Sequence, residues 1–466
     1  MTSAALGRLA ANWSEIRFPI LVVLAIGLAG GLMAALPAPV AVLVPLGVMG
    51  LYLFLALPLP ALAWLWGLAL PIWTVQGVPP AAFDLMRITM LGVLLLRARR
   101  DTNEPSAKVI HSWVIPLAAL ALLLLGMSLV RDDQIGVVSG YTMVLSVLAS
   151  WVIAHRRVLH RHILMGFAVG ATISGLVVVL QALGLPNPAA SSGDIMRKPG
   201  LASTTVYMGD ALAIAAVICC VLVVNRENKG SRRWLAFVGL AVSTAGLVLS
   251  GGRGGMAAAG LGLAALAVGP RTLRPAHVVV GGLLLGAGLW MASRVGVELY
   301  TIARFSGGTI GGSSTYVGGI TNGRLEVNIE SLRVIAAHSV FGPGISNFYA
   351  SYGLTAHTTP LFFALGTGVV GGLLALVLLA RLVVLLLRRP LMCGPQMATG
   401  YGIVVALATL ALMEPNAPFI GMMYLPVLMI SVMALQSAPS PEEESASGTK
   451  SESGYLYADH RLRTGN

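Results

Sequence analysis

Residues 112–130 read SWVIPLAALALLLLGMSLV and contain no charged side chain. About 20 consecutive apolar residues in helical conformation cross the roughly 30 Å hydrocarbon core of a bilayer. The stretch therefore predicts a membrane-spanning helix, and similar stretches recur along the chain. By the same criterion, about fourteen segments are candidates for spans. They lie near residues 18–36, 39–57, 59–77, 82–97, 112–130, 137–154, 162–184, 207–224, 234–250, 254–269, 276–293, 359–387, 398–413 and 419–436.

The composition of the chain also indicates a membrane protein. Of its 466 residues, 56% are hydrophobic and only 10% are charged, whereas roughly a quarter of the residues of a soluble domain are charged. The mean hydropathy is +0.84. These values exclude a water-soluble globule, a disordered chain and a coiled coil. They predict an all-α polytopic membrane protein with about 12, and up to about 14, transmembrane helices.

Two candidate segments, 82–97 and 254–269, are short, which leaves the number of full spans open. The first also carries Asp84 and Arg87. Their i,i+3 spacing on a helix lets the two charges neutralise each other.

The basic residues predict the orientation of the helices. The formal net charge is +12, from 30 Lys and Arg against 18 Asp and Glu. Basic residues mark every second connection, near 97–108, 156–161, 226–233, 271–274 and 381–389. By the positive-inside rule these connections, and with them both termini, face the cytoplasm. We therefore attribute the positive charge to membrane topology and expect no nucleic-acid partner.

One long connection on the opposite side divides the chain. We expect residues 1–293 to form an N-terminal helix bundle and 294–358 a periplasmic loop domain with short helices. Residues 359–436 then form the C-terminal transmembrane helices. The polar residues 437–466 are expected to be a disordered cytoplasmic tail.

Within this loop, residues 324–340 predict an amphipathic helix that ends before a Gly-Pro-Gly sequence. One stripe at helical spacing comprises Leu325, Ile329, Leu332 and Ala336. A second stripe comprises Arg324, Asn328, Ser331, Ile335 and His338, and Arg333 points the opposite way. In a straight helix Arg324 and His338 are about 21 Å apart, too far to hold one small group. Taken alone, His338 is at a position more typical of a C-cap than of a catalyst.

Several cations lie on the side where the positive-inside rule disfavours them. Arg197 and Lys198 follow the segment ending at 184, and Arg253 stands in Ser250-Gly-Gly-Arg-Gly-Gly. Any one arginine there has an alternative role in binding a lipid head group, and the glycines have one in a tight turn. Together they favour an anion site, because the guanidinium fork binds phosphate oxygens bidentately. A helix opening at Gly254 would add a favourable N-terminus.

The remaining polar residues give weaker signals. Asp132 and Asp133 form a carboxylate pair in a short connection, where a solvated turn is favoured over a cation site. Asp210 is a better-placed candidate near the end of a span. The three cysteines have no spacing typical of a disulfide or metal site. No Walker A sequence is present, so direct coupling to ATP is not indicated.

The ordered set of motifs around these cations resembles the O-antigen ligase and polymerase superfamily, and most closely its O-antigen ligases. The matching pieces are Arg197-Lys-Pro-Gly200, Ser250-Gly-Gly-Arg253-Gly, Arg324, His338-Ser-Val-Phe-Gly342-Pro-Gly344-Ile-Ser-Asn-Phe348, His357 and Leu361-Phe-Phe-Ala-Leu-Gly-Thr-Gly-Val-Val-Gly371. The sequence departs from the family pattern at Asn328, where Trp is frequent, and at Ser339, where Pro is frequent. It also departs at Thr358, where Asn is frequent, and at Gly366, where an acidic residue is frequent.

The resemblance implies an activity and its partners. Such ligases transfer a glycan from undecaprenyl diphosphate to the lipid A–core oligosaccharide, at the periplasmic face of the bacterial inner membrane. The family implies no metal or other cofactor. Arg197 and Arg253 would bind the diphosphate and His338 would act as general base. Lys198, Arg324, His357 and Asn347 are further candidates for contacts with substrate or loop, and membrane lipids are expected partners.

Other functions remain open from the sequence. An O-antigen polymerase or a protein oligosaccharyltransferase would use the same donor chemistry and differ in the acceptor. A transporter of lipid-linked sugars would place cations and broken helices near the middle of the bilayer, whereas these cations cluster at one surface. A ligase with two lipid substrates also predicts a lateral opening beneath the 294–358 loop.

Overall fold

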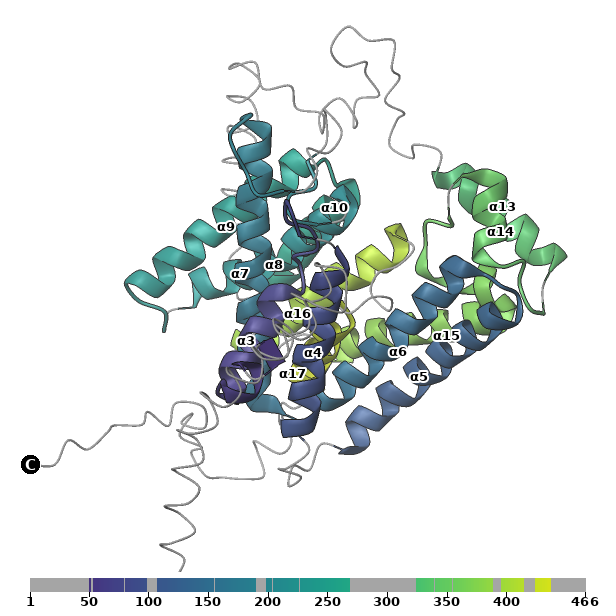
Figure 1. Ribbon diagram of the computed structural model, residues 1–466, viewed down its shortest axis with the longest axis horizontal. Helices are drawn as coiled ribbons and strands as arrows, with labels where there is room; N and C mark the ends of the chain where they lie inside the picture. Colours follow the sequence, from purple (N-terminus) through teal and green to yellow (C-terminus); the bar gives the residue numbers. More distant parts are fainter. Residues whose placement is uncertain are drawn as a thin grey trace, which may run out of the picture.

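The computed structural model of the chain is almost entirely helical where it is described (Figure 1). The described residues are 50–51, 53–78, 80–98, 107–154, 156–189, 198–202, 204–225, 227–268, 324–338, 340–353, 355–388, 395–414 and 424–436. Of these residues 84% are helical, and none belongs to a strand. The expected spans 18–36 and 276–293, most of 39–57, and the tail 437–466 lie outside this part of the chain.

The described part of the chain contains thirteen helices. They are α3 (Leu59–Ala69), α4 (Pro80–Ala98), α5 (Ala107–Val130), α6 (Gln134–Ala154), α7 (Arg157–Ala182), α8 (Thr205–Val224), α9 (Ser231–Ser250), α10 (Arg253–Val268), α13 (Arg324–Ala337), α14 (Ile345–Tyr352), α15 (Thr359–Arg388), α16 (Pro395–Met413) and α17 (Tyr424–Gln436). In this set α5, α6, α7, α8, α9, α15 and α16 are the 7 helices long and apolar enough to cross a membrane. The chain is thus a helical, membrane-embedded protein, and the total of 12 to 14 spans stays a prediction.

The short segments behave in different ways. The expected pair in α4 is present, with Arg87 Nη2 3.3 Å from Asp84 Oδ1. The expected span 59–77 is wrong beyond Ala69, where α3 ends. The backbone N–H groups of Trp73 and Thr74 donate instead to the carbonyl of Leu201, at 2.7 and 3.0 Å. A distant loop therefore takes the hydrogen bonds that a longer helix would have used.

Glycines allow several helices to pack with their backbones in contact. A Cβ atom at Gly67, Gly166 or Gly170 would collide with a backbone carbonyl across the α3–α7 interface. Small residues at such interfaces are typical of membrane helices, where packing rather than the hydrophobic effect drives association.

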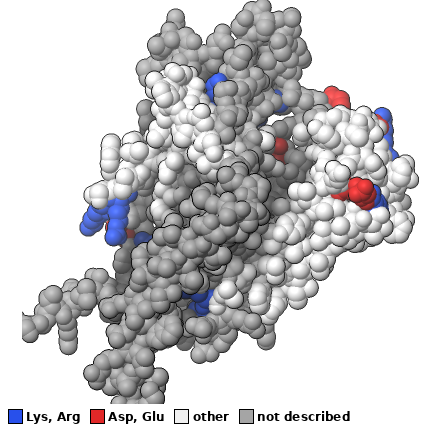
Figure 2. Space-filling view, viewed as in Figure 1, with Lys and Arg blue, Asp and Glu red and all other residues white. Residues whose placement is uncertain are grey.

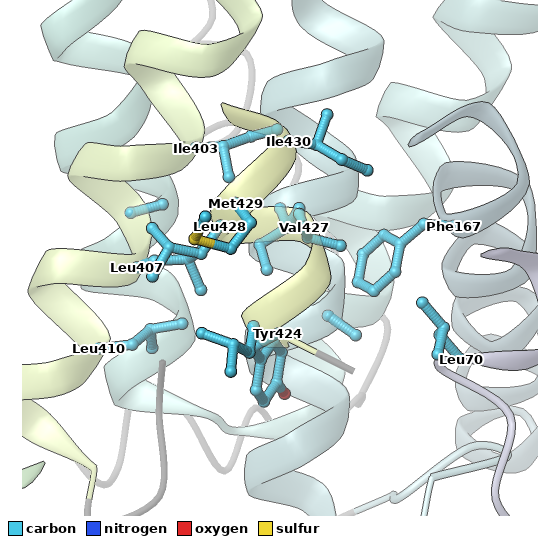
Figure 3. Close-up of a cluster of buried hydrophobic side chains, with 14 of the residues drawn as sticks. Leu70, Phe167, Ile403, Leu407, Leu410, Tyr424, Val427, Leu428, Met429 and Ile430 are labelled. Carbon is cyan, nitrogen blue, oxygen red and sulfur yellow. The ribbon is translucent and has the colours of Figure 1, made fainter. Parts of the chain in front are cut away.

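The core lies between α17 and the helices around it. Figure 3 shows Tyr424 and Leu428 of α17 packed among Leu407 and Leu410 of α16 and near Phe167 of α7, and all five are buried. Like the core, the surface consists mostly of uncharged side chains. Figure 2 shows that the described residues present a broad uncharged surface, with charged side chains in a few separate places.

Helix α15 extends beyond the helix it packs against, α5. At one end Arg381 donates to the carbonyl of Ser112 at 2.6 Å. At the other end Arg131, just after α5, donates to the carbonyl of Gly366 at 3.3 Å. Helix α15 is broken at Gly368, whose φ of 75° and ψ of −169° are not helical. The break lies within the length of α5, since Gly366 packs against Leu124 and Gly371 against Leu120, and the Arg131 side chain reaches back to it.

Candidate functional site

The Arg253 turn lies where α8 and α10 meet in backbone contact. Gly251 ends α9 with a φ of 68°, and α10 begins at Arg253, as the sequence predicted. The Cα of Gly209 lies 3.2 Å from the position of a Cβ at Gly252, and a Cβ at Gly255 would collide with the backbone of Gly209. The geometry of the turn and the close packing of α8 and α10 are therefore sufficient to explain the glycines.

Arg253 is buried rather than open to solvent, and buried carboxylates lie in the same region. Arg253 is 6% exposed, Glu414 5% and Asp210 1%. Glu414 follows α16, and its Oε1 lies 2.6 Å from the position of a Cβ at Gly254. Its backbone carbonyl accepts a hydrogen bond from Thr359 Oγ1 at 3.2 Å. A carboxylate thus rests against the first turn of α10.

Glu414 is not among the site residues predicted from the sequence. The available signal was an acidic residue, followed directly by Pro415, between two apolar segments. At Gly366, where the sequence lacks an acidic residue, a Cβ would lie 2.6 Å from Leu124 Cδ1, so Leu124 would have to move to admit a larger side chain.

Aromatic residues connect this buried charged cluster to α4. The Tyr424 hydroxyl donates to the carbonyl of Tyr207 at 3.2 Å, and Tyr424 interacts electrostatically with Asp210 and Glu414. The ring of Tyr207 stacks on Trp73 with centroids 5.7 Å apart. The guanidinium of Arg87 lies 4.6 Å from the centroid of a Trp73 ring.

The loop that follows Arg197 is held firmly beside the start of α8. Gly200 N–H donates to Gln181 Oε1 at 3.0 Å, and Leu201 N–H donates to Ser174 Oγ at 2.8 Å. Lys198 is half-buried at the beginning of this loop. Arg197 itself lies outside the described residues, so its expected role is not tested.

The loop helices α13 and α14 sit beside the broken part of α15 (Figure 1). The predicted helix at 324–340 is confirmed as α13, and its second stripe is the buried one, with Ser331 0% and Ile335 6% exposed. Asn328 on that stripe accepts the backbone N–H of His357 at 2.8 Å. Arg324 is the first residue of α13. The lateral opening expected beneath the loop stays a prediction, since residues 269–323 are not described.

His338 has the capping position that the sequence predicted. Its ring Nδ1 lies 3.1 Å from the carbonyl oxygen of Val334, one helical turn earlier, and the side chain is exposed. A carbonyl oxygen only accepts hydrogen bonds, so Nδ1 carries the proton. In the neutral ring Nε2 then keeps its lone pair. Nearby, Asn347 is exposed and donates to the carbonyl of Pro343 at 3.1 Å.

The expectation of a solvated turn is wrong for Asp133. It is 4% exposed, and it accepts the N–H groups of Ile345 at 2.6 Å and Ser346 at 3.0 Å. These groups open α14, so a carboxylate is favoured at this helix N-terminus. Burial alone would raise the pKa of Asp133. Hydrogen bonds from the Ser346 hydroxyl and three backbone N–H groups outweigh burial and hold the pKa below its ordinary value.

The Asp133→Asn variant is expected to loosen α14 in a pH-dependent way. Loss of a charged acceptor from buried donors costs about 1–3 kcal/mol. Because the folded-state pKa is lowered, this stability is present above the unfolded value of about 3.9 and is lost as pH falls through the folded value. The thermal unfolding midpoints of wild type and variant should therefore differ at pH 7 and converge below about pH 4. Asp132→Asn, at an exposed neighbouring residue, is the control, and an equal effect there would contradict the assignment.

Hydrogen bonds connect the start of α15 to residues of two other elements at this end. Thr359 contacts Glu414, and His357, two residues earlier, contacts Asn328 of α13. Among the described residues, no group of three or more His, Cys, Asp or Glu is placed to hold a metal ion.

The fold and this end of the bundle define a helical membrane protein with a buried charged cluster where α8, α10 and the end of α16 pack together. Comparison of the sequence with protein-family models and with curated proteins gives no match.

Proposed function

We propose that the chain is an O-antigen ligase, which transfers the glycan from undecaprenyl diphosphate to lipid A–core at the periplasmic face of the bacterial inner membrane. One observation carries the proposal. The loop beginning at Lys198, the Arg253 turn and the loop bearing His338 and His357 lie at the same end of the helices. The starts of α8 and α10 pack together there, and Glu414 contacts both the start of α10 and Thr359 at the start of α15. In the proposal this end supplies charged groups for a diphosphate and an imidazole for a hydroxyl.

The proposed reaction is a direct displacement at the anomeric carbon. A sugar hydroxyl of the acceptor attacks this carbon, and the bond to the diphosphate oxygen breaks with its electron pair on that oxygen. Arg197 and Arg253 bind the diphosphate and stabilise the developing charge. Burial of Arg253 strengthens this interaction, because the local dielectric constant is lower than in water.

The hydroxyl proton passes to Nε2 of His338. The hydrogen bond from Nδ1 to Val334 supports this role, since it fixes the tautomer that leaves Nε2 as the acceptor. The product has the inverted configuration at the anomeric carbon. The sugar–diphosphate bond supplies the energy, so the proposed reaction requires neither nucleotide nor cofactor.

The other candidate residues have supporting roles in this proposal. Arg324 is the first residue of α13 and His338 directly follows its last, about 21 Å apart, so in the proposal they contact different groups. Asn328 holds the backbone at His357, which places that side chain near the start of α15 and lets it meet the acceptor. Lys198 and Asn347 are further contacts for substrate or loop.

The break at Gly368 is packed within the protein. It lies beside the part of α5 between Leu120 and Leu124, and the backbone of Val340 and Phe341 packs directly against it. Non-helical backbone is tolerated there because protein covers it. A one-sided enzyme is favoured over a transporter by the cations, which lie at one end of the helices rather than near the bilayer midplane.

Reconstitution tests the proposal. The purified full chain in detergent would receive undecaprenyl-diphosphate glycan and lipid A–core in the presence of EDTA. We expect slower-migrating lipopolysaccharide. Extension of the lipid-linked glycan without transfer to lipid A–core would identify a polymerase, and transfer to a protein acceptor would identify an oligosaccharyltransferase. Failure of all three reactions with intact protein would contradict the proposal.

A further inference from the structure

Helix α13 presents an apolar surface away from the rest of the protein. Its residues are Leu325, Ile329 and Leu332, and the surface continues through Val340 and Phe341 after the helix. These side chains are between 43% and 64% exposed. We call these five residues the outer face. The first three belong to the apolar stripe predicted from the sequence, whereas α13 buries its other stripe.

The outer face is bordered by charge. Arg333 lies about 100° around the helix from Leu332, is 74% exposed, and pairs with Glu330 at 3.1 Å. Tyr352 of α14 also donates to Glu330 at 3.0 Å. The open side of α13 is therefore amphipathic in itself, with an apolar stripe beside a charged one. Such a pattern is typical of a helix that lies in the interface of a bilayer.

The level of the outer face agrees with such an interface. The Gly344 N–H donates to the carbonyl of Leu365 at 3.0 Å, and Gly342 packs against the same turn of α15. That turn packs against Leu124, about 9 Å before α5 ends at Val130. Ile345 and Ser346, which follow Gly344, contact Asp133 in the connection between α5 and α6, so the loop that carries Val340 and Phe341 lies near the end of the spanning helices.

The outer face also continues a surface that lipid already covers in a membrane-embedded chain. Exposed apolar side chains on α5 and α15 lead up to it, among them Leu129, Val130, Val369 and Val370. Apolar surface of this kind is unfavourable in water by about 25 cal/mol per Å², and contiguous patches mark interaction sites.

We infer that the outer face of α13 docks on the lipid surface, with its apolar side chains at the boundary between head groups and acyl chains. The loop helices would then be held at a fixed height over the membrane by lipid as well as by α15. This inference requires only that the chain is embedded in a membrane, and it holds whether or not the chain is a ligase.

Spin labelling of the full chain in phospholipid vesicles tests the inference. In a variant without its native cysteines, Leu332→Cys and Arg333→Cys would each carry a nitroxide, and Val370→Cys would give the lipid-facing reference. We expect the label at 332 to collide with oxygen more than with a water-soluble nickel complex, at a depth of about 5–10 Å. The label at 333, on the neighbouring charged stripe, should show the opposite preference.

Three outcomes would overturn the inference. Equal access of both labels to the nickel complex would place the outer face in water. A label at 332 shielded from both reagents would mean that protein covers it. Dipolar broadening that disappears on dilution with unlabelled protein would identify a second copy of the chain as the occupant. A stable fold of each variant is checked by its thermal unfolding in detergent.

Discussion

Replacing His338 with alanine is expected to lower the rate of glycan transfer by about 10²–10⁴-fold, the usual contribution of a general base. The nucleophile is a sugar hydroxyl, which remains protonated at neutral pH and needs an acceptor for its proton. Nε2 of His338 is available for that proton because Nδ1 donates to Val334. Removal of the ring leaves the diphosphate contacts unchanged, so binding of the donor should be retained.

The capping role of His338 must be separated from the catalytic one. His338→Asn keeps a side-chain N–H donor near the carbonyl of Val334 but provides no base. We expect this variant to unfold at the wild-type temperature and to transfer glycan as slowly as His338→Ala. Rates are compared in the reconstituted reaction with both lipid substrates. Transfer by His338→Asn at near the wild-type rate would show that His338 only caps the helix and is not the general base.

Features set by local sequence could be predicted. The 7 long helices coincide with expected spans, because length and hydropathy suffice to identify a membrane helix. The helix α13 and its stop before Gly342 follow from helical periodicity and from glycine and proline. The pair of Asp84 and Arg87 follows from i,i+3 spacing.

Features set by contacts between distant parts of the chain could not be predicted from the sequence. Asp133 contacts Ile345, 212 positions away, and no local rule distinguishes it from its exposed neighbour Asp132. The α3 segment ends before Pro71, a local signal, but the contact of Trp73 and Thr74 with Leu201, far along the chain, was not predictable. Periodicity likewise defined both stripes of α13 without deciding which one is buried.

The candidate site shows the same division. The glycine-flanked Arg253 could be singled out as a cation on an unexpected side, but its burial beside Glu414 depends on how α10, α16 and α15 meet. The sequence therefore predicted the residue types for an anion site and singled out Asp210, but it missed Glu414, whose carboxylate lies against the first turn of α10. Those carboxylates change what a substitution at Arg253 is expected to do.

Arg253→Ala is expected to abolish glycan transfer and also to destabilise the protein. Removing one member of a buried group of opposite charges costs about 3–5 kcal/mol, because the remaining charges are left uncompensated. Here the remaining charges are the buried carboxylates Glu414 and Asp210. Loss of activity alone would therefore not show that Arg253 contacts the diphosphate.

A second substitution separates the two effects. The double variant Arg253→Ala/Glu414→Gln removes one charge of each sign from the cluster, so we expect it to recover much of the thermal stability that Arg253→Ala loses. It still lacks the guanidinium for the diphosphate and should remain inactive in the reconstituted reaction. Arg253→Lys keeps the charge without the bidentate fork, and we expect it to fold and to transfer slowly. Wild-type transfer by the double variant would make Arg253 a structural residue, since its only role would then be to neutralise Glu414.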